Sequence, residues 1–228
     1  MTIKTRHHFW PSLVFFIVLI AASGMAFPAM LSGQAFENRP ALIIVDIQNF
    51  YFPGGSLPLQ GSEAASLNAK RVLELFRMKT WPVIHVRHLP KSMPDAPPSG
   101  DPQWSFQANV MPLAGESVVT KHEVNGFRGT NLLDLLNNLK VKNLVIIGMQ
   151  THMCLEGAVR AAADYGFAVT VAEDACATRD LEYNGKKIPA DAVHLSTLAT
   201  LKGAYAKVLT AEELLKELSP AGSPAMSK

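Results

Sequence analysis

The amino-acid sequence predicts an α/β fold in which a parallel, Rossmann-like sheet lies between two layers of helices. Short unbroken apolar runs such as Ala41–Val45 and Leu144–Ile147 are typical of strands buried on both faces of a parallel sheet. Segments with helical spacing of apolar residues separate these runs along the chain, which indicates strand–helix–strand units. No repeat or low-complexity tract interrupts this alternation, so we expect a single domain over residues 36–218.

The first half of this domain is expected to contain three strands and two helices. Strands are predicted over residues 41–45, 82–88 and 116–121, and the spacing of Leu67, Val72, Leu73 and Phe76 predicts a helix over residues 62–79. The segment 89–112 is rich in proline and turn-forming residues; a loop of this length inside a compact domain is usually a lid or a binding loop. A glycine-punctuated turn then leads into a helix over residues 131–139.

The second half repeats the pattern. The strand 144–147 is followed by a helix from about residue 152, in which Leu155, Val159 and Ala162 share one face and Gly166 provides the stop. Next come a strand over residues 168–173, a helix over 190–203, a strand over 206–209 and a helix over 211–218 with Thr210 as its N-cap. Residues 219–228 are predicted to be a disordered tail.

Residues 1–35 have the organisation of a secretory signal peptide. Lys4 and Arg6 precede the apolar run Leu13–Ala22, and cleavage is expected after Ala26 or Ala35. The apolar run is short for a membrane span, although its flanks could extend it into an uncleaved anchor. We therefore expect an exported protein, periplasmic or secreted, with no stable membrane partner unless the leader is retained.

Charge and cysteine content exclude several classes of protein. The 228-residue chain carries 21 Lys and Arg against 19 Asp and Glu, and the leader holds two of the basic residues and none of the acidic ones. The remaining domain is electrically balanced, so nucleic acid is not an expected partner. With Cys154 and Cys176 as the only cysteines, a disulfide framework and a multi-cysteine zinc site are excluded, while a single bridge between the two stays open.

Three reactive side chains stand at the carboxyl ends of predicted strands: Asp46, Lys121 and Cys154. Each has an ordinary structural explanation, because Asp often caps a turn, Lys is usually solvated, and free Cys is usually a small buried hydrophobe. However, the carboxyl ends of parallel strands share one edge of the sheet, where ligands bind in open α/β folds. Their coincidence at that edge favours a functional site.

The position of Cys154 in the first turn of a helix also bears on its chemistry. Unpaired amide N–H groups and the positive end of the helix dipole favour an anion there. We therefore expect the thiolate to form more readily than the reference pKa of about 8.5 suggests. By contrast, His85 and His88 are three residues apart on one strand and point to opposite faces, so they are not expected to ligate one metal ion.

Four motifs carry a resemblance to a known family: IIVDIQNFYFPGG, VTKHEVNGFRGTNL, GMQTHMCLEGAVRAAADYGF and VAEDACAT. Between Ala41 and about Leu209 the sequence resembles the isochorismatase-like cysteine hydrolases, which include nicotinamidases, N-carbamoylsarcosine amidase and streptothricin hydrolase. The resemblance implies a catalytic triad of Asp46, Lys121 and Cys154. It also implies a cis peptide bond between Met149 and Gln150, which would direct the Gln150 and Cys154 N–H groups at one oxygen.

The activity implied by this resemblance is hydrolysis of the C–N bond of a small amide through a thioester, with no cofactor, in a homo-oligomer. Nicotinamidases have an Asp-Trp-His metal motif after the second strand, whereas HVRHLP here places Arg87 near the Asp position, which argues against a metal site. Isochorismatase itself lacks the cysteine nucleophile. The alternative from a different class is an exported, non-catalytic protein of the same fold that binds a small molecule.

Four side chains are predicted to line the substrate pocket: Phe52, Trp104, Phe127 and His152. Trp104 would be an inward-facing anchor of the long loop, and His152 is adjacent to Cys154 in sequence. Phe52 and Phe127 fit a core position equally well, and a solvated histidine at a helix start is the ordinary explanation of His152.

Overall fold

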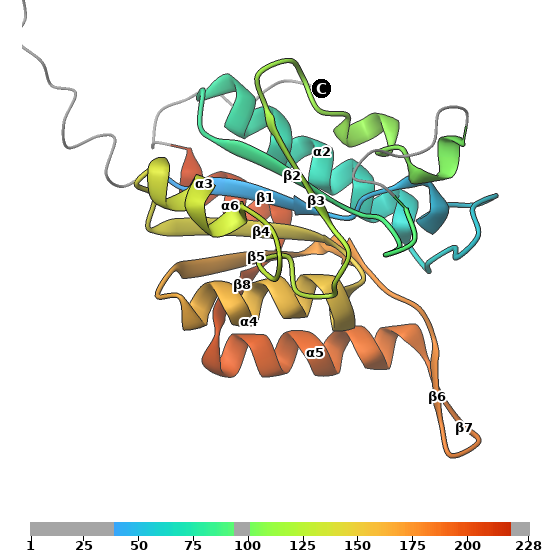
Figure 1. Ribbon diagram of the computed structural model, residues 1–228. Helices are drawn as coiled ribbons and strands as arrows, with labels where there is room; N and C mark the ends of the chain where they lie inside the picture. The colour runs from blue at the N-terminus through green and yellow to red at the C-terminus, as the bar shows by residue number, and fades with distance from the viewer. Residues whose placement is uncertain (1–38, 94–100, 220–228) are drawn as a thin grey trace, which may run out of the picture. The chain divides into compact units, whose positions relative to one another are not determined.

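The computed structural model describes residues 39–93 and 101–219, and within them it confirms the predicted α/β fold (Figure 1). A six-stranded parallel sheet has the order β3-β2-β1-β4-β5-β8. Its strands are β1 (Ala41–Val45), β2 (Val83–His88), β3 (Ser117–Lys121), β4 (Asn143–Met149), β5 (Ala168–Ala177) and β8 (Ala206–Leu209). The leader predicted for residues 1–35 lies outside the described residues, as does all but the first residue of the tail predicted for 219–228, so export stays a prediction.

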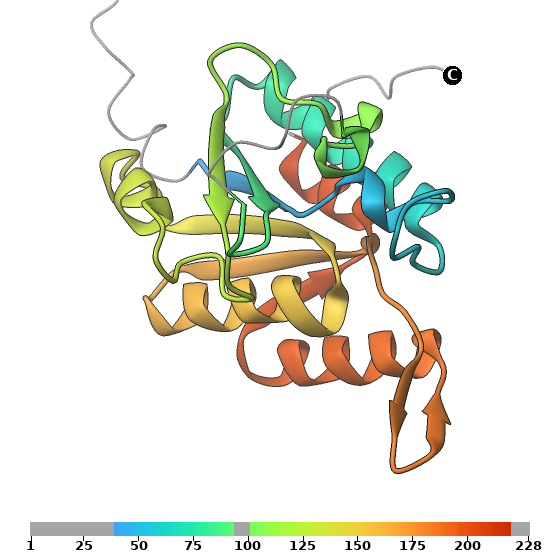
Figure 2. The same ribbon diagram turned by 45° about the vertical axis from the view of Figure 1, so that its right-hand side comes forward.

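Helices cover both faces of this sheet. One face is covered by α2 (Ser62–Met78) and α6 (Ala211–Leu218), and the other by α4 (Glu156–Asp164) and α5 (Ala190–Ala204), with the short α3 (Leu132–Asn138) on the side of α4 (Figures 1 and 2). Thr210 caps α6 in a reciprocal capping box with Glu213, as its position in the sequence predicts. Among the described residues, no helix is both long and apolar enough to cross a lipid bilayer.

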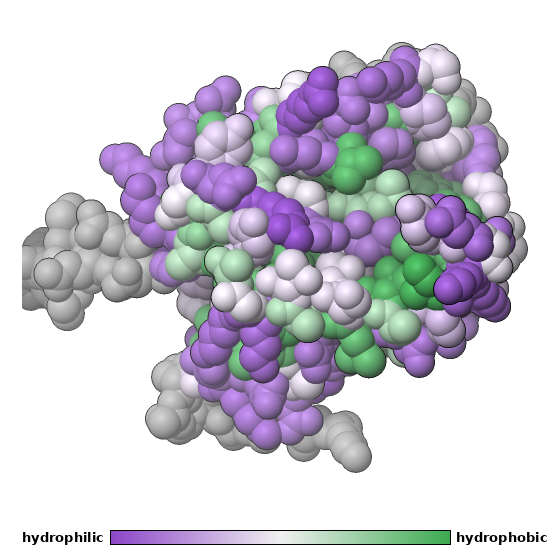
Figure 3. Space-filling model, turned by 90° about the horizontal axis from the view of Figure 1, so that it is seen from below, coloured by the Kyte–Doolittle hydropathy of each residue, from purple (hydrophilic) through white to green (hydrophobic). Residues whose placement is uncertain are grey.

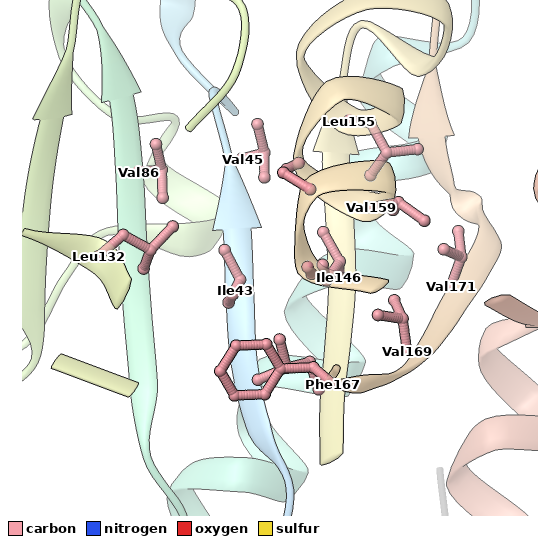
Figure 4. Close-up of a cluster of buried hydrophobic side chains, with 14 of the residues drawn as sticks. Ile43, Val45, Val86, Leu132, Ile146, Leu155, Val159, Phe167, Val169 and Val171 are labelled. Atoms are coloured by element: carbon pink, nitrogen blue, oxygen red, sulfur yellow. The ribbon is translucent and has the colours of Figure 1, made fainter. Parts of the chain in front are cut away.

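Two hydrophobic cores result from the alternation of side chains along the central strands. In β1, Ile43 and Val45 point towards α4 and α3, whereas Leu42 and Ile44 point towards α2. Figure 4 shows the first of these cores, in which residues of β1, β2, β4 and β5 pack against Leu155 and Val159 of the helical layer. Because both faces are buried, these strands appear in the sequence as continuous apolar runs.

One glycine sets how closely the two central strands approach. Gly148 of β4 has φ +135°, and a Cβ atom at this position would collide with the carbonyl oxygen of Val45 in β1. Glycine is therefore required where β4 turns towards the nucleophile segment. The strand continues to Met149, and the Met149–Gln150 peptide bond is cis, as the resemblance implies.

Three features of the chain were not predicted. β5 extends to Ala177, because it resumes its pairing with β4 after a register shift between Ile146 and Gly148. A two-stranded antiparallel hairpin of β6 (Leu181–Tyr183) and β7 (Lys186–Ile188) projects from the body before α5 (Figures 1 and 2). The described part of the loop 89–112 contains two short 3₁₀ helices, η2 (Pro102–Trp104) and η3 (Ala108–Val110).

Hydrophilic residues make up much of the surface on the side of α4 and α5, with hydrophobic patches between them (Figure 3). Exposed apolar side chains on this part of the chain include Leu195 of α5 and Tyr183 of the hairpin. Scattered apolar residues of this kind are normal on soluble domains. The homo-oligomer expected from the sequence therefore stays a prediction.

Candidate active site

The three predicted catalytic side chains meet at the carboxyl edge of the sheet. Asp46 directly follows β1, Lys121 is the last residue of β3, and Cys154 lies in the π-helical turn η4 (Thr151–Leu155) that follows β4. The Lys121 Nζ is 2.7 Å from the Asp46 Oδ2 and donates a hydrogen bond to the Cys154 Sγ at 3.2 Å. Asp46 and Lys121 are completely buried, and Cys154 is 5% exposed.

The backbone around Asp46 holds its carboxylate at this edge. The Asp46 N–H donates to the Val86 carbonyl, which extends the pairing of β1 with β2 by one residue, and Asp46 itself has φ +51°. A non-glycine residue in this conformation is strained, and such strain is often found at functional sites. The next residues turn into a 3₁₀ helix, η1 (Asn49–Tyr51), which brings Tyr51 to the same region.

Cys154 differs in one respect from the prediction. Burial, followed by the nearby Asp46 carboxylate, raises the pKa of the Cys154 thiol to about 12, although the Lys121 ammonium acts in the opposite direction. The expected lowering of the pKa at a helix start is therefore wrong, because Cys154 is buried within η4 and α4 begins only at Glu156. At neutral pH the side chain is a thiol that needs a base.

The cation of this site is the ammonium group of Lys121. Burial disfavours the ammonium form of Lys121, but the Asp46 carboxylate, with a further contribution from Cys154 when its thiolate forms, outweighs burial and raises the pKa of Lys121. Cys154 and Cys176 are both free thiols, so the disulfide that the sequence left open is not formed. Cys176 is buried in β5, where its Sγ contacts the Ala172 carbonyl.

Gln150, the predicted oxyanion-hole residue, is buried and held from two sides. Its Nε2 donates to the Tyr51 hydroxyl at 3.2 Å, and its Oε1 accepts from the Arg179 Nε at 3.1 Å. Burial, followed by the nearby Asp46 carboxylate, raises the pKa of Tyr51 above its ordinary value. Tyr51 was not predicted as a site residue.

The predicted pocket residues have different surroundings. Phe52 and Phe127 are buried in the two hydrophobic cores, Phe127 in the same core as Cys154. Trp104 is partly exposed, and the centroid of its ring lies 5.3 Å from that of the tilted Phe50 ring. The Trp104 carbonyl accepts a hydrogen bond from Gln48. His152 is partly exposed, with its Nδ1 2.5 Å from the Thr178 Oγ1. A role in substrate binding stays a prediction for all four.

Two further residues at this edge, Gln48 after β1 and His88 at the end of β2, were not predicted as members of the site. The buried side chain of Gln48 accepts a hydrogen bond from the His88 N–H at 2.7 Å and donates to the His88 carbonyl, which fixes the end of β2. The His88 Nδ1 lies 3.2 Å from the Lys121 Nζ. His88 is the last residue of β2 and Gln48 comes three residues after β1, so both lie at the same edge as the triad, which is the signal that could have identified them.

Asp46, His88 and Cys154 place potential metal-ligand atoms within 4.8 Å of one another. The residues do not fit a metal site, because the Lys121 ammonium stands among them, within 3.2 Å of all three. A metal ion would have to share this space with a buried positive charge. Arg87, near the position of the metal-binding Asp in nicotinamidases, donates to the Thr120 hydroxyl instead.

Comparisons with known proteins agree on one family. Residues 40–213 match the model of the isochorismatase domain. The chain is 40% identical over 185 residues to the uncharacterized isochorismatase family protein YddQ of Bacillus subtilis, covering 77% of this chain and 98% of the relative. It is 27% identical over 198 residues to a maleamate amidohydrolase of Pseudomonas putida, covering 80% of this chain and 88% of the relative. The crystal structure of an isochorismatase from Pseudomonas putida KT2440 superimposes with a TM-score of 0.72 at 35% identity, covering 78% of this chain and 90% of that structure.

Proposed function

The chain belongs to the isochorismatase family and is a hydrolase, and we propose that it is a cysteine-dependent amidohydrolase that cleaves the C–N bond of a small amide through a thioester. The observation that carries this proposal is the contact of one buried ammonium, that of Lys121, with both the Asp46 carboxylate and the Cys154 sulfur. A carboxylate, an ammonium and a thiol that share a buried site can exchange a proton and support nucleophilic catalysis.

In the first step, Asp46 acts as the general base. Its carboxylate oxygen lies within 4.8 Å of the Cys154 Sγ, and a thiol with a pKa of about 12 needs such a base at neutral pH. As the thiol proton moves to Asp46, the sulfur electron pair attacks the amide carbon. Lys121 stabilises the thiolate at this stage, because its charge opposes the effect of burial on the sulfur.

Collapse of the tetrahedral intermediate breaks the C–N bond. Asp46 gives its proton to the departing nitrogen, which leaves as ammonia or an amine, and the acyl group remains on Cys154 as a thioester. Water then attacks the thioester as Asp46 accepts its proton. The proton returns to the sulfur when the carboxylic acid product is released, so that the site is restored.

We assign the oxyanion of both intermediates to the backbone N–H groups of Gln150 and Cys154. The support for this is that both groups lie on the segment between β4 and α4, and that the Gln150 side chain is anchored by Tyr51 and Arg179. A fixed backbone donor does not need to reorganise during the reaction. One well-placed donor of this kind contributes about 3 kcal/mol to transition-state stabilisation.

The substrate class follows from burial and from one relative. Because Cys154 is only 5% exposed, the reacting carbonyl must belong to a small or slender group. The maleamate amidohydrolase of Pseudomonas putida acts, by its name, on a small amide, which supports the same class here. Trp104 and His152, both partly exposed, are proposed to line the approach to the sulfur.

The proposal is tested by a screen of small amides, including carbamoyl compounds and lactams, against the purified protein. We expect at least one of them to be hydrolysed with release of ammonia or an amine at a rate proportional to protein concentration, because the site contains a complete set of groups for acyl transfer. Activity that requires an added divalent metal ion and is abolished by a chelator would contradict the mechanism. Inactivity across the screen would favour the alternative of a non-catalytic binder.

A further inference from the structure

The three residues of the predicted triad belong to three strand ends, and the end of one further strand lies between them with no role in the proposed mechanism. The order of the first four strands is β3-β2-β1-β4, and Lys121, Asp46 and Cys154 belong to the ends of β3, β1 and β4. The strand between β3 and β1 is β2, whose last residue is His88. In the register of the sheet, His88 pairs directly with Lys121. The Lys121 side chain therefore reaches Asp46 by crossing the end of β2.

At this crossing the three hydrogens of the Lys121 ammonium are matched by three acceptors, and Asp46 is an ion-pair partner in addition. Its Nζ lies 2.7 Å from the Asp46 Oδ2, 3.2 Å from the Cys154 Sγ, 3.2 Å from the His88 Nδ1 and 3.1 Å from the Glu123 carbonyl oxygen. An ammonium offers three N–H donors. These hydrogens go to the Cys154 sulfur, the His88 ring and the Glu123 carbonyl, whereas neither Asp46 carboxylate oxygen has a hydrogen-bond partner among the described residues.

The His88 ring can accept one of these hydrogens only in its neutral form. Burial, followed by the positive charge of Lys121, lowers the pKa of His88, so that the imidazole is neutral at physiological pH. The backbone on both sides of the ring is fixed, because the Gln48 side chain binds the His88 N–H at 2.7 Å and the His88 carbonyl at 3.2 Å. Nδ1 is thus held at a constant place beside Nζ.

We propose that His88 is a positioning residue that holds the Lys121 ammonium between Asp46 and Cys154 by accepting a hydrogen bond at Nδ1. Without this acceptor, the freed N–H turns to a carboxylate oxygen of Asp46, which has no other hydrogen-bond partner among the described residues, and the ammonium is drawn away from the sulfur. The inference rests on the proposed cysteine chemistry, since it concerns how Lys121 activates Cys154. Protonation of His88 would have the same effect as its removal, because Nδ1 could no longer accept and the ring would repel Lys121.

The test measures alkylation of Cys154 by iodoacetamide, followed by peptide mass spectrometry, in the full protein. Two variants are compared with the wild type: His88→Leu, which has no acceptor, and His88→Asn, whose Oδ1 can replace Nδ1 but does not titrate. Alkylation of Cys176 in the same samples is the internal control for loosening of the fold, because this thiol is buried in β5.

We expect the His88→Leu variant to be alkylated at Cys154 about tenfold more slowly than the wild type, because a hydrogen bond to a charged group is lost. The His88→Asn variant should stay within about threefold of the wild type. The pH profile separates a positioning role from a merely structural one. As the pH falls below about 6.5, the ordinary pKa of histidine, the wild-type rate should fall by several-fold more than that of His88→Asn, because the lowered pKa of His88 places its protonation below that value. The titratable groups that surround position 88 are present in all three proteins, so their titration alone does not produce this difference; they are Asp46, Lys121, Cys154 and His122.

Two results would overturn the inference: alkylation of Cys154 at the wild-type rate in the His88→Leu variant, or a decrease of the alkylation rate at low pH in His88→Asn that is as large as in the wild type. If the leucine variant fails to fold, Cys176 is alkylated faster than in the wild type. In that case the pH profile of the asparagine variant alone tests the inference. The experiment needs no substrate. A protein that hydrolyses no amide but shows these differences would refute the proposed function and not the role of His88.

Discussion

Replacement of Cys154 by alanine is expected to reduce the hydrolysis of any amide found in the screen by about 10⁴-fold or more, the size of effect seen when a covalent nucleophile is removed. Both proposed half-reactions pass through the sulfur, so no other described group at this edge can replace it. The fold should persist, because Cys154 lies in a turn and is a small part of a core that includes Leu155 and Val159. The measurement is the initial rate together with the thermal unfolding temperature.

The second cysteine of the chain provides the matched control. Cys176 is also buried and free, but it lies in β5 with its Sγ against the Ala172 carbonyl. A Cys176→Ala variant removes the same atoms and should retain turnover within about tenfold, since the lost contact is structural. Equal activity of the Cys154→Ala variant and the wild type would exclude the thioester mechanism.

Replacement of Lys121 by methionine is expected to damage both stability and activity. The change removes the cation of a completely buried ion pair and leaves the Asp46 carboxylate without a counter-charge. Breaking a buried pair in this way costs about 3–5 kcal/mol in the free energy of unfolding. Turnover should fall by at least about 10³-fold, because the thiolate loses its neighbouring positive charge.

An exposed ion pair offers the comparison for this variant. Lys207 contacts Glu217 at 2.6 Å, but the two side chains are about half exposed. The Lys207→Met variant should unfold at nearly the wild-type denaturant concentration, because solvent screens such pairs. The raised pKa of Lys121 also predicts how stability depends on pH. The contribution of Lys121 to the free energy of unfolding is complete below the pKa of an unfolded lysine and is lost as the pH rises through the pKa of Lys121 in the folded protein. A Lys121→Met variant as stable as Lys207→Met would contradict this account of the site.

The parts of the fold that could be predicted are those with a strong local signal. The apolar run Ala41–Val45 identifies a strand buried on both faces, and the Thr210–Glu213 pair identifies the start of α6. The β6–β7 hairpin was missed although its turn, Asn184-Gly185, has the positive φ angles and the residues that favour such turns. Its strands have only three residues each and no alternating apolar face, so periodicity does not reveal them.

The candidate site was predicted in its residues but not in its energetics. Parallel strands place their carboxyl ends together, which is why Asp46, Lys121 and Cys154 could be grouped from their positions alone. The sign of the shift in the Cys154 pKa could not be predicted, because it depends on burial and on the distance to Asp46. The contact between His88 and Lys121 could not be predicted either, because it depends on the register of β2 with β3.

The central claim is that the acyl group of the substrate is carried on the sulfur of Cys154, and acid quenching during turnover of the amide identified in the screen tests it most directly. We predict that mass spectrometry of the quenched protein finds the acyl mass on the peptide that contains Cys154, and that hydroxylamine removes it. Rapid turnover with unmodified Cys154 at every quench time, together with retained activity in the Cys154→Ala variant, would contradict the claim.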